Sequence, residues 1–156
     1  MDFATIFRLE ENLNLDKKTL VILRWIAIFG QVFSVNLVYF FLDLNFPVLL
    51  CHIIIAVGFF TNLYLQFGLK ATLLKDGYSR SFLMYDIVQL SFLLFLTGGI
   101  FNPFAILLIV PTIVSSTFLS IGSTIILGSL TIILLFVLTF FKMPLPGMEE
   151  YVLSFP

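Results

Sequence analysis

The sequence predicts an all-α integral membrane protein, built as a bundle of about five transmembrane helices. Of its 156 residues, 60% are hydrophobic and only 11% are charged, and the mean hydropathy is +1.13. Globular domains carry about 25% charged residues, so this chain has too few polar side chains to surround a core in water. Its apolar residues also form runs long enough to cross a bilayer, separated by short segments rich in Gly, Pro, Asn or charge.

Each apolar run is close to the length of about 20 residues that crosses roughly 30 Å of hydrocarbon as a helix. The longest run, residues 103–141, holds no charged residue, but as one helix it would extend about 58 Å. We therefore divide it at Ser120–Ser123. Pro111 lacks an N–H group and is expected to kink the helix that contains it. The expected helices are residues 20–42, 47–68, 79–97, 103–119 and 124–141.

Lysine and arginine placement predicts the orientation, because cytoplasmic loops of membrane proteins are enriched in both. With a cytoplasmic N-terminal segment at residues 1–18, seven of the eight cations lie on the inner side and only Lys142 lies outside. The transmembrane region is then 19–141, and residues 142–156 form an extracytoplasmic tail. We expect that tail to be cut short before a further segment.

The composition excludes several kinds of site and partner. A net charge of −1 gives no reason to expect a nucleic acid. Because Cys51 is the only cysteine, there is no intrachain disulfide. Because His52 is the only histidine, two histidines of one chain cannot hold a haem, and neither a haem nor a metal site is expected. The expected surroundings are the lipid bilayer and molecules dissolved in it.

The stretch LTGGIFNPF, residues 96–104, concentrates backbone-specific residues between two apolar runs. Gly98 and Gly99 follow the third helix, where a chain leaving a helix favours positive φ. Asn102 stands at the N-cap of the fourth helix and Pro103 at its first position, which are favoured positions for both residues. A tight helical hairpin at the outer membrane interface would explain every residue of the stretch.

The same stretch also suits a flat ligand. A helix N-terminus presents free N–H groups and the positive end of the helix dipole, which together favour an oxygen acceptor. The glycines allow a ligand to approach the backbone, and Phe101 and Phe104 offer aromatic faces for stacking. A quinone, with ring carbonyls and solubility in lipid, fits this description. From the residues alone, the hairpin is the preferred interpretation.

Other polar side chains lie within the expected helices. Asp86 and Arg24 fall at similar depth, and because a buried carboxylate in a membrane is costly, we expect them to form an ion pair. Gln89 is one turn beyond Asp86 and is expected to form a hydrogen bond with a neighbouring helix. His52 and Asn36 lie at the depth of the glycine loop, where either could donate to a quinone carbonyl. For Asn36 an interhelical hydrogen bond is preferred, and for His52 both interpretations stay open.

Four segments of the chain resemble the RegB/PrrB family of redox-responsive sensor histidine kinases. TGGIFNPFAILLIVP is similar to the GGxxNPF loop of that family, and ILRWIAIFGQ, YDIVQLSFLLFLTGG and KMPLP resemble other parts of its membrane domain. The resemblance implies a sensor domain of six helices in the bacterial inner membrane that senses ubiquinone through this loop. It also implies a homodimer and a cytoplasmic kinase that phosphorylates a response regulator. By the resemblance, the quinone-sensing residues are Gly98, Gly99, Asn102, Pro103 and Phe104.

The sequence departs from the family in its extent. It contains neither a sixth helix, nor a phosphoacceptor helix, nor the glycine boxes of an ATP site, so we do not expect this chain to be a kinase by itself. The preferred hypothesis is a quinone-binding sensor domain of a histidine kinase. Two alternatives are a small transporter or channel subunit, and a quinone-reactive subunit of a membrane oxidoreductase.

Overall fold

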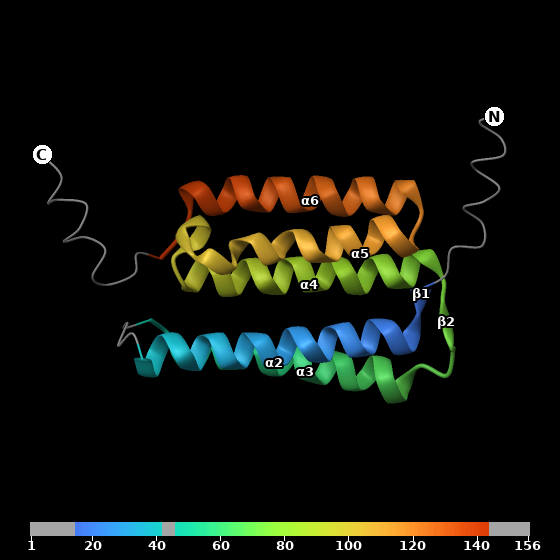
Figure 1. Ribbon diagram of the computed structural model, residues 1–156, viewed down its shortest axis with the longest axis horizontal. Coiled ribbons are helices and arrows are strands. Elements are labelled where there is room, and N and C mark those ends of the chain that lie inside the picture. Colours follow the sequence, from blue (N-terminus) through green and yellow to red (C-terminus); the bar gives the residue numbers. More distant parts are fainter. Residues whose placement is uncertain (1–14, 42–45, 144–156) are drawn as a thin grey trace, which may run out of the picture.

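The computed structural model describes residues 15–41 and 46–143, and within them the chain is an all-α bundle in two layers (Figure 1). This confirms the predicted fold class. The α-helices are α2 (Lys17–Phe41), α3 (Val48–Leu63), α4 (Asp76–Leu96), α5 (Val110–Phe118) and α6 (Ile121–Phe140). A π-helix, η1 (Tyr64–Gly68), continues α3, and the 3₁₀ helices η2 (Gly99–Phe101) and η3 (Pro103–Ile109) precede α5. Two short strands, β1 (Leu15–Asp16) and β2 (Leu73–Leu74), pair antiparallel.

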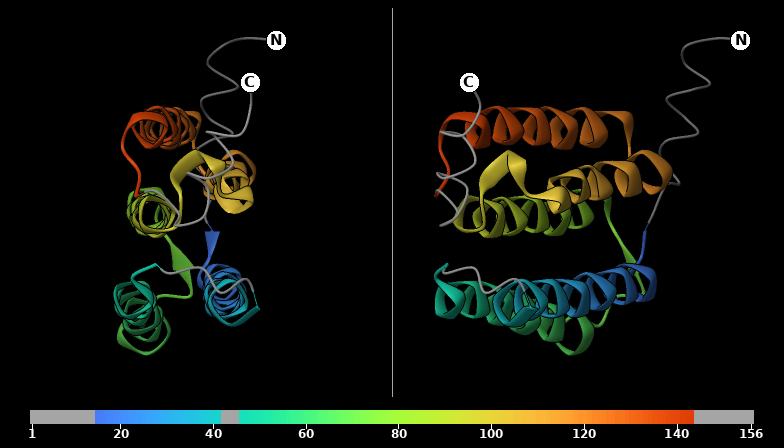
Figure 2. Two further views of the ribbon diagram at one scale, coloured as in Figure 1. Left: turned by 90° about the vertical axis from the view of Figure 1, so that its left-hand side faces the viewer. Right: turned by 60° about the vertical axis from the view of Figure 1, so that its left-hand side comes forward.

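The helices pack as a hairpin of α2 and α3 against a layer of three. The end view in Figure 2 places α3 under α4 and α2 under α5, with α6 on the far side of α4 and α5. Contacts between the layers run mainly through α3 and α4, whereas α2 packs mostly on α3. One apolar core joins Leu83 and Leu127 of the layer of three to Leu20 of α2, and a smaller one joins Ile55 of α3 to Leu93 of α4.

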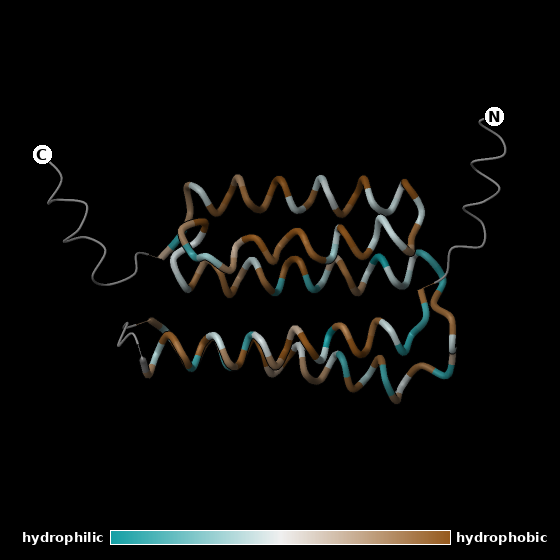
Figure 3. The backbone as a smooth tube through the Cα atoms, in the orientation of Figure 1, coloured by the Kyte–Doolittle hydropathy of each residue, from teal (hydrophilic) through white to brown (hydrophobic). Residues whose placement is uncertain are grey.

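The outer faces of the helices are as apolar as the core. Phe33, Phe67, Ile132 and Phe136 each expose at least 65% of their surface. Figure 3 shows hydrophobic residues along all the long helices, with hydrophilic residues gathered near β1 and β2. Soluble monomers rarely expose apolar patches of more than a few hundred Å². Lipid is therefore the solvent for these faces, and the chain is a multi-pass membrane protein.

Four helical segments are long and apolar enough to cross a membrane: Lys17–Phe40, Val48–Gly68, Asp76–Leu96 and Ile121–Phe140. The apolar helix Pro103–Phe118 is shorter than these four. It begins with seven residues of 3₁₀ helix, followed by nine of α-helix. Since a 3₁₀ helix rises about 2.0 Å per residue and an α-helix about 1.5 Å, this segment extends about 28 Å, instead of about 24 Å as a uniform α-helix.

Pro111 explains where the helix changes type. In a continuous α-helix the carbonyl of Leu107 would accept from the N–H of residue 111, which proline lacks. The carbonyl accepts instead from Val110 N–H, three residues on, and the α-helical pattern begins at Val110. The structure thus shows a change from 3₁₀ to α-helix next to Pro111, and the kink predicted there stays a prediction.

Asp76, at the start of α4, forms hydrogen bonds with the turn between α5 and α6. Its carboxylate accepts from Ser120 N–H at 2.7 Å, from Ser120 Oγ at 3.1 Å and from Ser123 Oγ. Ser120 is also the N-cap of α6, accepting from Ser123 N–H at 3.2 Å. The break at Ser120 is as predicted, but α6 begins at Ile121 instead of near residue 124 because of this cap.

Candidate functional site: a cavity between the two layers

The LTGGIFNPF stretch forms the predicted turn and cap. Gly98 and Gly99 adopt φ values of +102° and +63°, in the left-handed region that suits glycine. Asn102 caps η3: its Oδ1 accepts from Phe104 N–H at 2.9 Å, with Pro103 at the first helical position. The Nδ2 group of Asn102 donates to Thr97 O at 3.1 Å and to Thr97 Oγ1 at 2.8 Å.

This capping changes what the loop offers to a ligand. The N–H of Phe104 is bonded to Asn102 Oδ1, and the N–H of Ala105 to Asn102 O at 2.9 Å. Pro103 has no N–H. The expectation that the first turn presents free N–H groups is therefore wrong, because the asparagine that begins the helix also uses those donors. A ligand oxygen at the start of η3 therefore needs a donor other than the N–H groups of Phe104 and Ala105.

The loop also packs against the end of α6. A Cβ atom at Gly99 would lie 2.8 Å from Leu138 O and 2.7 Å from Lys142 Cβ. The Lys142 ammonium lies 3.6 Å from the centroid of the Phe101 ring, and Met143 N–H donates to Phe95 O at 2.9 Å. Gly99 therefore serves the contact between the loop and α6.

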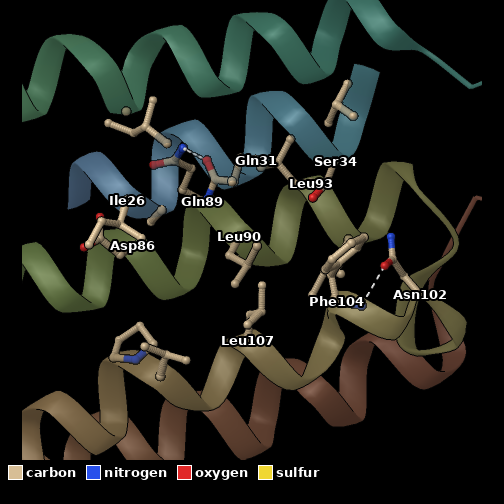
Figure 4. A pocket seen from close by; sticks show the side chains of 18 of the residues that line it. Ile26, Gln31, Ser34, Asp86, Gln89, Leu90, Leu93, Asn102, Phe104 and Leu107 are labelled. Atoms are coloured by element: carbon tan, nitrogen blue, oxygen red, sulfur yellow. Dashed lines mark hydrogen bonds between the residues drawn. The ribbon is translucent and has the colours of Figure 1, made fainter. Parts of the chain in front are cut away.

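A cavity of about 700 Å³ lies between α2 on one side and α4, η3 and α5 on the other (Figure 4). Its lining on α2 runs from Leu20 to Val38, which corresponds to about 27 Å of helix. The volume is within the range of about 300–1,000 Å³ that is usual for ligand sites. The lining is mostly aliphatic, and on the side of α4 and η3 Leu90 and Leu107 point towards one another.

The loop forms one end of this cavity through Phe101, Asn102, Pro103 and Phe104. Four of the loop residues singled out from the sequence are thus brought together at one wall. Among the described residues, Gly98 and Gly99 are not part of the lining. The geometry assigns these two glycines to the turn and to the α6 contact.

The predicted Arg24–Asp86 ion pair is present and lies along the cavity wall. Arg24 Nε and Nη2 both lie 3.0 Å from Asp86 Oδ1, and Nη2 also donates to Thr61 Oγ1 at 2.9 Å. The Arg24 side chain is only 4% exposed and that of Asp86 22%. In a lipid environment this pairing offsets the cost of two ionised groups.

The hydrogen bond predicted for Gln89 is also present, since its Nε2 donates to Gln31 Oε1 of α2 at 3.2 Å (Figure 4). Gly58 of α3 makes room for it, because a Cβ there would lie 2.5 Å from Gln89 Nε2. Gln31 and Gly58 were not among the residues predicted from the sequence. Gln31 lies seven residues after Arg24, on the same face of α2, and that spacing was a signal available from the sequence.

His52 and Asn36 bond to each other instead of facing the cavity. Asn36 Nδ2 lies 3.3 Å from His52 Nε2, and His52 Nδ1 lies 2.9 Å from Val48 O. A carbonyl accepts only from a protonated nitrogen, which assigns the proton of a neutral ring to Nδ1 and leaves Nε2 to accept from Asn36. The interhelical bond preferred for Asn36 is confirmed. Among the described residues His52 does not line the cavity, and its quinone role stays a prediction.

In sequence, the chain is similar to a known sensor histidine kinase. It is 35% identical over 140 residues to the sensor histidine kinase RegB of Cereibacter sphaeroides, and the match covers 89% of this chain. The chain spans 30% of the length of that relative. No family model matches the sequence, and no solved structure matches it. By this identity, and with helices apolar enough to cross a membrane, the chain is a relative of the RegB/PrrB family of sensor histidine kinases.

Proposed function

We propose that this chain is the membrane-embedded redox sensor domain of a two-component sensor histidine kinase, and that it binds a quinone in the cavity between α2 and η3. The observation that carries the proposal is the cavity itself, about 700 Å³ of mostly aliphatic wall with Phe101 and Phe104 at one end. Ubiquinone combines a flat polar ring with a long apolar tail, and an elongated cavity of this lining suits both parts.

The proposal includes an arrangement of the whole protein. The N-terminus lies in the cytoplasm of a bacterium, the chain forms a homodimer, and an attached cytoplasmic kinase passes phosphate to a response regulator. A ligand changes the output of such a protein only by binding one helix arrangement more tightly than the other. The relation to RegB supports this assignment, and the cavity between two helical layers supplies a place where their packing can depend on a ligand.

The test is binding of a radiolabelled short-tail ubiquinone to the chain in lipid nanodiscs, measured against protein-free discs. Leu107 lines the cavity, so Leu107→Trp should fill it and weaken saturable binding at least about tenfold, equivalent to roughly 1.4 kcal/mol. Ile106 is the neighbouring residue, is 69% exposed on the outer face and lines no part of the cavity, so Ile106→Trp is the matched control.

Three results separate the explanations. Saturable binding that survives Ile106→Trp and is lost in Leu107→Trp, with equal helicity in both, supports a quinone site in the cavity. Equal binding by both variants places any quinone elsewhere. Uptake that matches protein-free discs at all concentrations is partitioning into lipid and overturns the proposed function.

A further inference from the structure

Two polar side chains of α2 line the cavity and carry donors that nothing in the described part of the chain accepts. Gln31 and Ser34 are about one turn apart on one face of the helix, on the side of α2 that faces α4 and η3 (Figure 4). Gln31 accepts from Gln89 through its Oε1. Within residues 15–41 and 46–143, neither Gln31 Nε2 nor Ser34 Oγ has an acceptor.

The other side-chain donors of the lining are bonded or sealed. Asn102 Nδ2 donates twice to Thr97, and Thr97 Oγ1 donates in turn to a backbone carbonyl of α4. Arg24 Nη1 has no acceptor among the described residues, but it is a fully buried atom and is not open to the cavity. Gln31 Nε2 and Ser34 Oγ are not buried in this way. Both donors are therefore accessible to a molecule in the cavity.

Gln89 determines which end of the Gln31 amide is free. Its Nε2 donates to Gln31 Oε1 at 3.2 Å, so the amide nitrogen of Gln31 is the end that remains. Gln89 is itself only 7% exposed, and its amide lies against Gly58, where a Cβ would come within 2.5 Å of Nε2 and 2.7 Å of Oε1. The free donor therefore belongs to α2, its orientation is set from α4, and α3 makes room for the residue that sets it.

We propose that Gln31 Nε2 and Ser34 Oγ donate hydrogen bonds to a carbonyl oxygen of the bound quinone, so that the quinone ring lies beside the middle of α2. This inference rests on the proposed function and adds to it the polar anchor of the site. A carbonyl oxygen has two lone pairs and accepts from both donors. Ligand sites are mostly apolar, with a few polar groups that fix the orientation of the ligand. Donors and acceptor are all neutral, so binding brings no charge into the membrane.

The space beside these two donors is open. Gly30, next to Gln31, also lines the cavity, and a Cβ atom there would meet nothing within 4 Å. Ile26, four residues before Gly30, lines the cavity as well and is 64% exposed. The cavity therefore reaches the outer face of α2, where lipid is the solvent. A quinone tail that leaves past Ile26 enters lipid while the ring stays at Gln31 and Ser34.

The test compares two ligands on the full chain in nanodiscs: short-tail ubiquinone, and an analogue of the same ring and tail in which hydrogen atoms replace both carbonyl oxygens. Ser34→Ala removes a donor but breaks no hydrogen bond between described residues. We expect it to weaken ubiquinone binding about fivefold, the change expected for one hydrogen bond, and binding of the analogue less than about twofold. Ser116→Ala is the control, because Ser116 of α5 lines no part of the cavity.

Gln31 is tested against its own partner. Gln31→Met and Gln89→Met both lose the bond between the two amides, but only Gln31→Met also loses the free donor. We expect ubiquinone to bind about fivefold more weakly to Gln31→Met than to Gln89→Met. The oxygen-free analogue should bind equally to both variants.

A third measurement follows the ligand oxygen itself. In ubiquinone labelled with ¹³C at one carbonyl at a time, one of the two C=O stretching bands should lie at lower frequency in the parent than in protein-free lipid. Ser34→Ala should move that band part of the way back.

Three results would overturn the anchor at Gln31 and Ser34 while quinone binding stands. They are an equal effect of Ser34→Ala on both ligands, equal ubiquinone binding by Gln31→Met and Gln89→Met, and C=O bands at the lipid frequency in the parent. Absence of saturable ubiquinone binding in the parent overturns the proposed function and this inference together.

Discussion

Gly99 provides the most direct test of how the loop is built, because two independent constraints meet at one Cα atom. Its φ of +63° lies in the left-handed region, which residues with a Cβ rarely adopt. A Cβ atom there would also lie 2.8 Å from the backbone oxygen of Leu138 and 2.7 Å from Lys142 Cβ. Gly99→Ala, the smallest substitution that adds a Cβ, should therefore be strongly destabilising.

The size of the effect follows from the two constraints. A non-glycine residue in the left-handed region costs roughly 1–2 kcal/mol. The contact with Leu138 O involves backbone, so α6 must shift to relieve it, and overpacking of this kind costs about 1–3 kcal/mol. We expect Gly99→Ala to lower the free energy of unfolding by about 2–5 kcal/mol.

The assay is an SDS titration in mixed micelles, followed by helicity and by the fluorescence of Trp25, the only tryptophan in the chain. Trp25 packs against Phe59 and donates to Gln66, so its emission reports on the α2–α3 hairpin. Gly77→Ala is the control, because a Cβ at Gly77 in the first turn of α4 has open space around it. That change should alter stability by less than about 1 kcal/mol.

Equal shifts of the SDS midpoint in Gly99→Ala and Gly77→Ala would refute the cost assigned to a Cβ atom at Gly99. A second outcome bears on the ligand. Gly99 does not line the cavity, so at SDS concentrations where the variant is folded it should bind ubiquinone with the affinity of the parent. Loss of binding in fully folded Gly99→Ala would mean that the glycine itself meets the ligand, contrary to the geometry described above.

Two further substitutions test contacts between the helices. Gly58→Ala should displace the Gln89 amide and remove its bond to Gln31, lowering the free energy of unfolding by about 0.5–1.5 kcal/mol. In a Gln31→Leu background the same substitution should cost less, and an unchanged cost would show that this bond is not what is lost. Ser120→Ala removes the N-cap of α6 and one bond to Asp76, and it should cost about 1–2 kcal/mol in the same titration. A cost within error of zero would mean that the Ser120 N–H bond to Asp76 holds the turn by itself.

Features governed by local chemistry were predictable from the sequence. Apolar run length identified the helices, and Gly98, Asn102 and Pro103 identified the turn and the cap, because each has a conformational preference that acts within a few residues. The Arg24–Asp86 pair was predictable for a different reason. Two opposite charges buried at matching depth in lipid have few other ways to be stabilised.

Other contacts between distant segments were not predictable. The bond from Asp76 to the Ser120 turn joins residues 44 apart in sequence, and neither residue is unusual by itself at a membrane boundary. The 3₁₀ form of residues 103–109 accommodates the missing N–H of Pro111, whereas the sequence led us to expect a kink. The cavity depends on the distance between α2 and the helices η3 and α5. No sequence pattern in these three helices encodes that distance.

The arrangement around Phe101 explains why an aromatic residue and a left-handed glycine stand so close together in this loop. Phe101 is one of the residues that line the cavity, and the Lys142 ammonium, two residues after α6, lies over its ring. Gly99 permits this by letting the loop backbone approach α6 more closely than any other residue could. Under the proposed function, a ligand that moves Phe101 also moves the contact with Lys142. Quinone binding would then change the contact between Phe101 and Lys142, at the end of α6. Such a contact, present in one helix arrangement and changed in the other, is what a population shift requires.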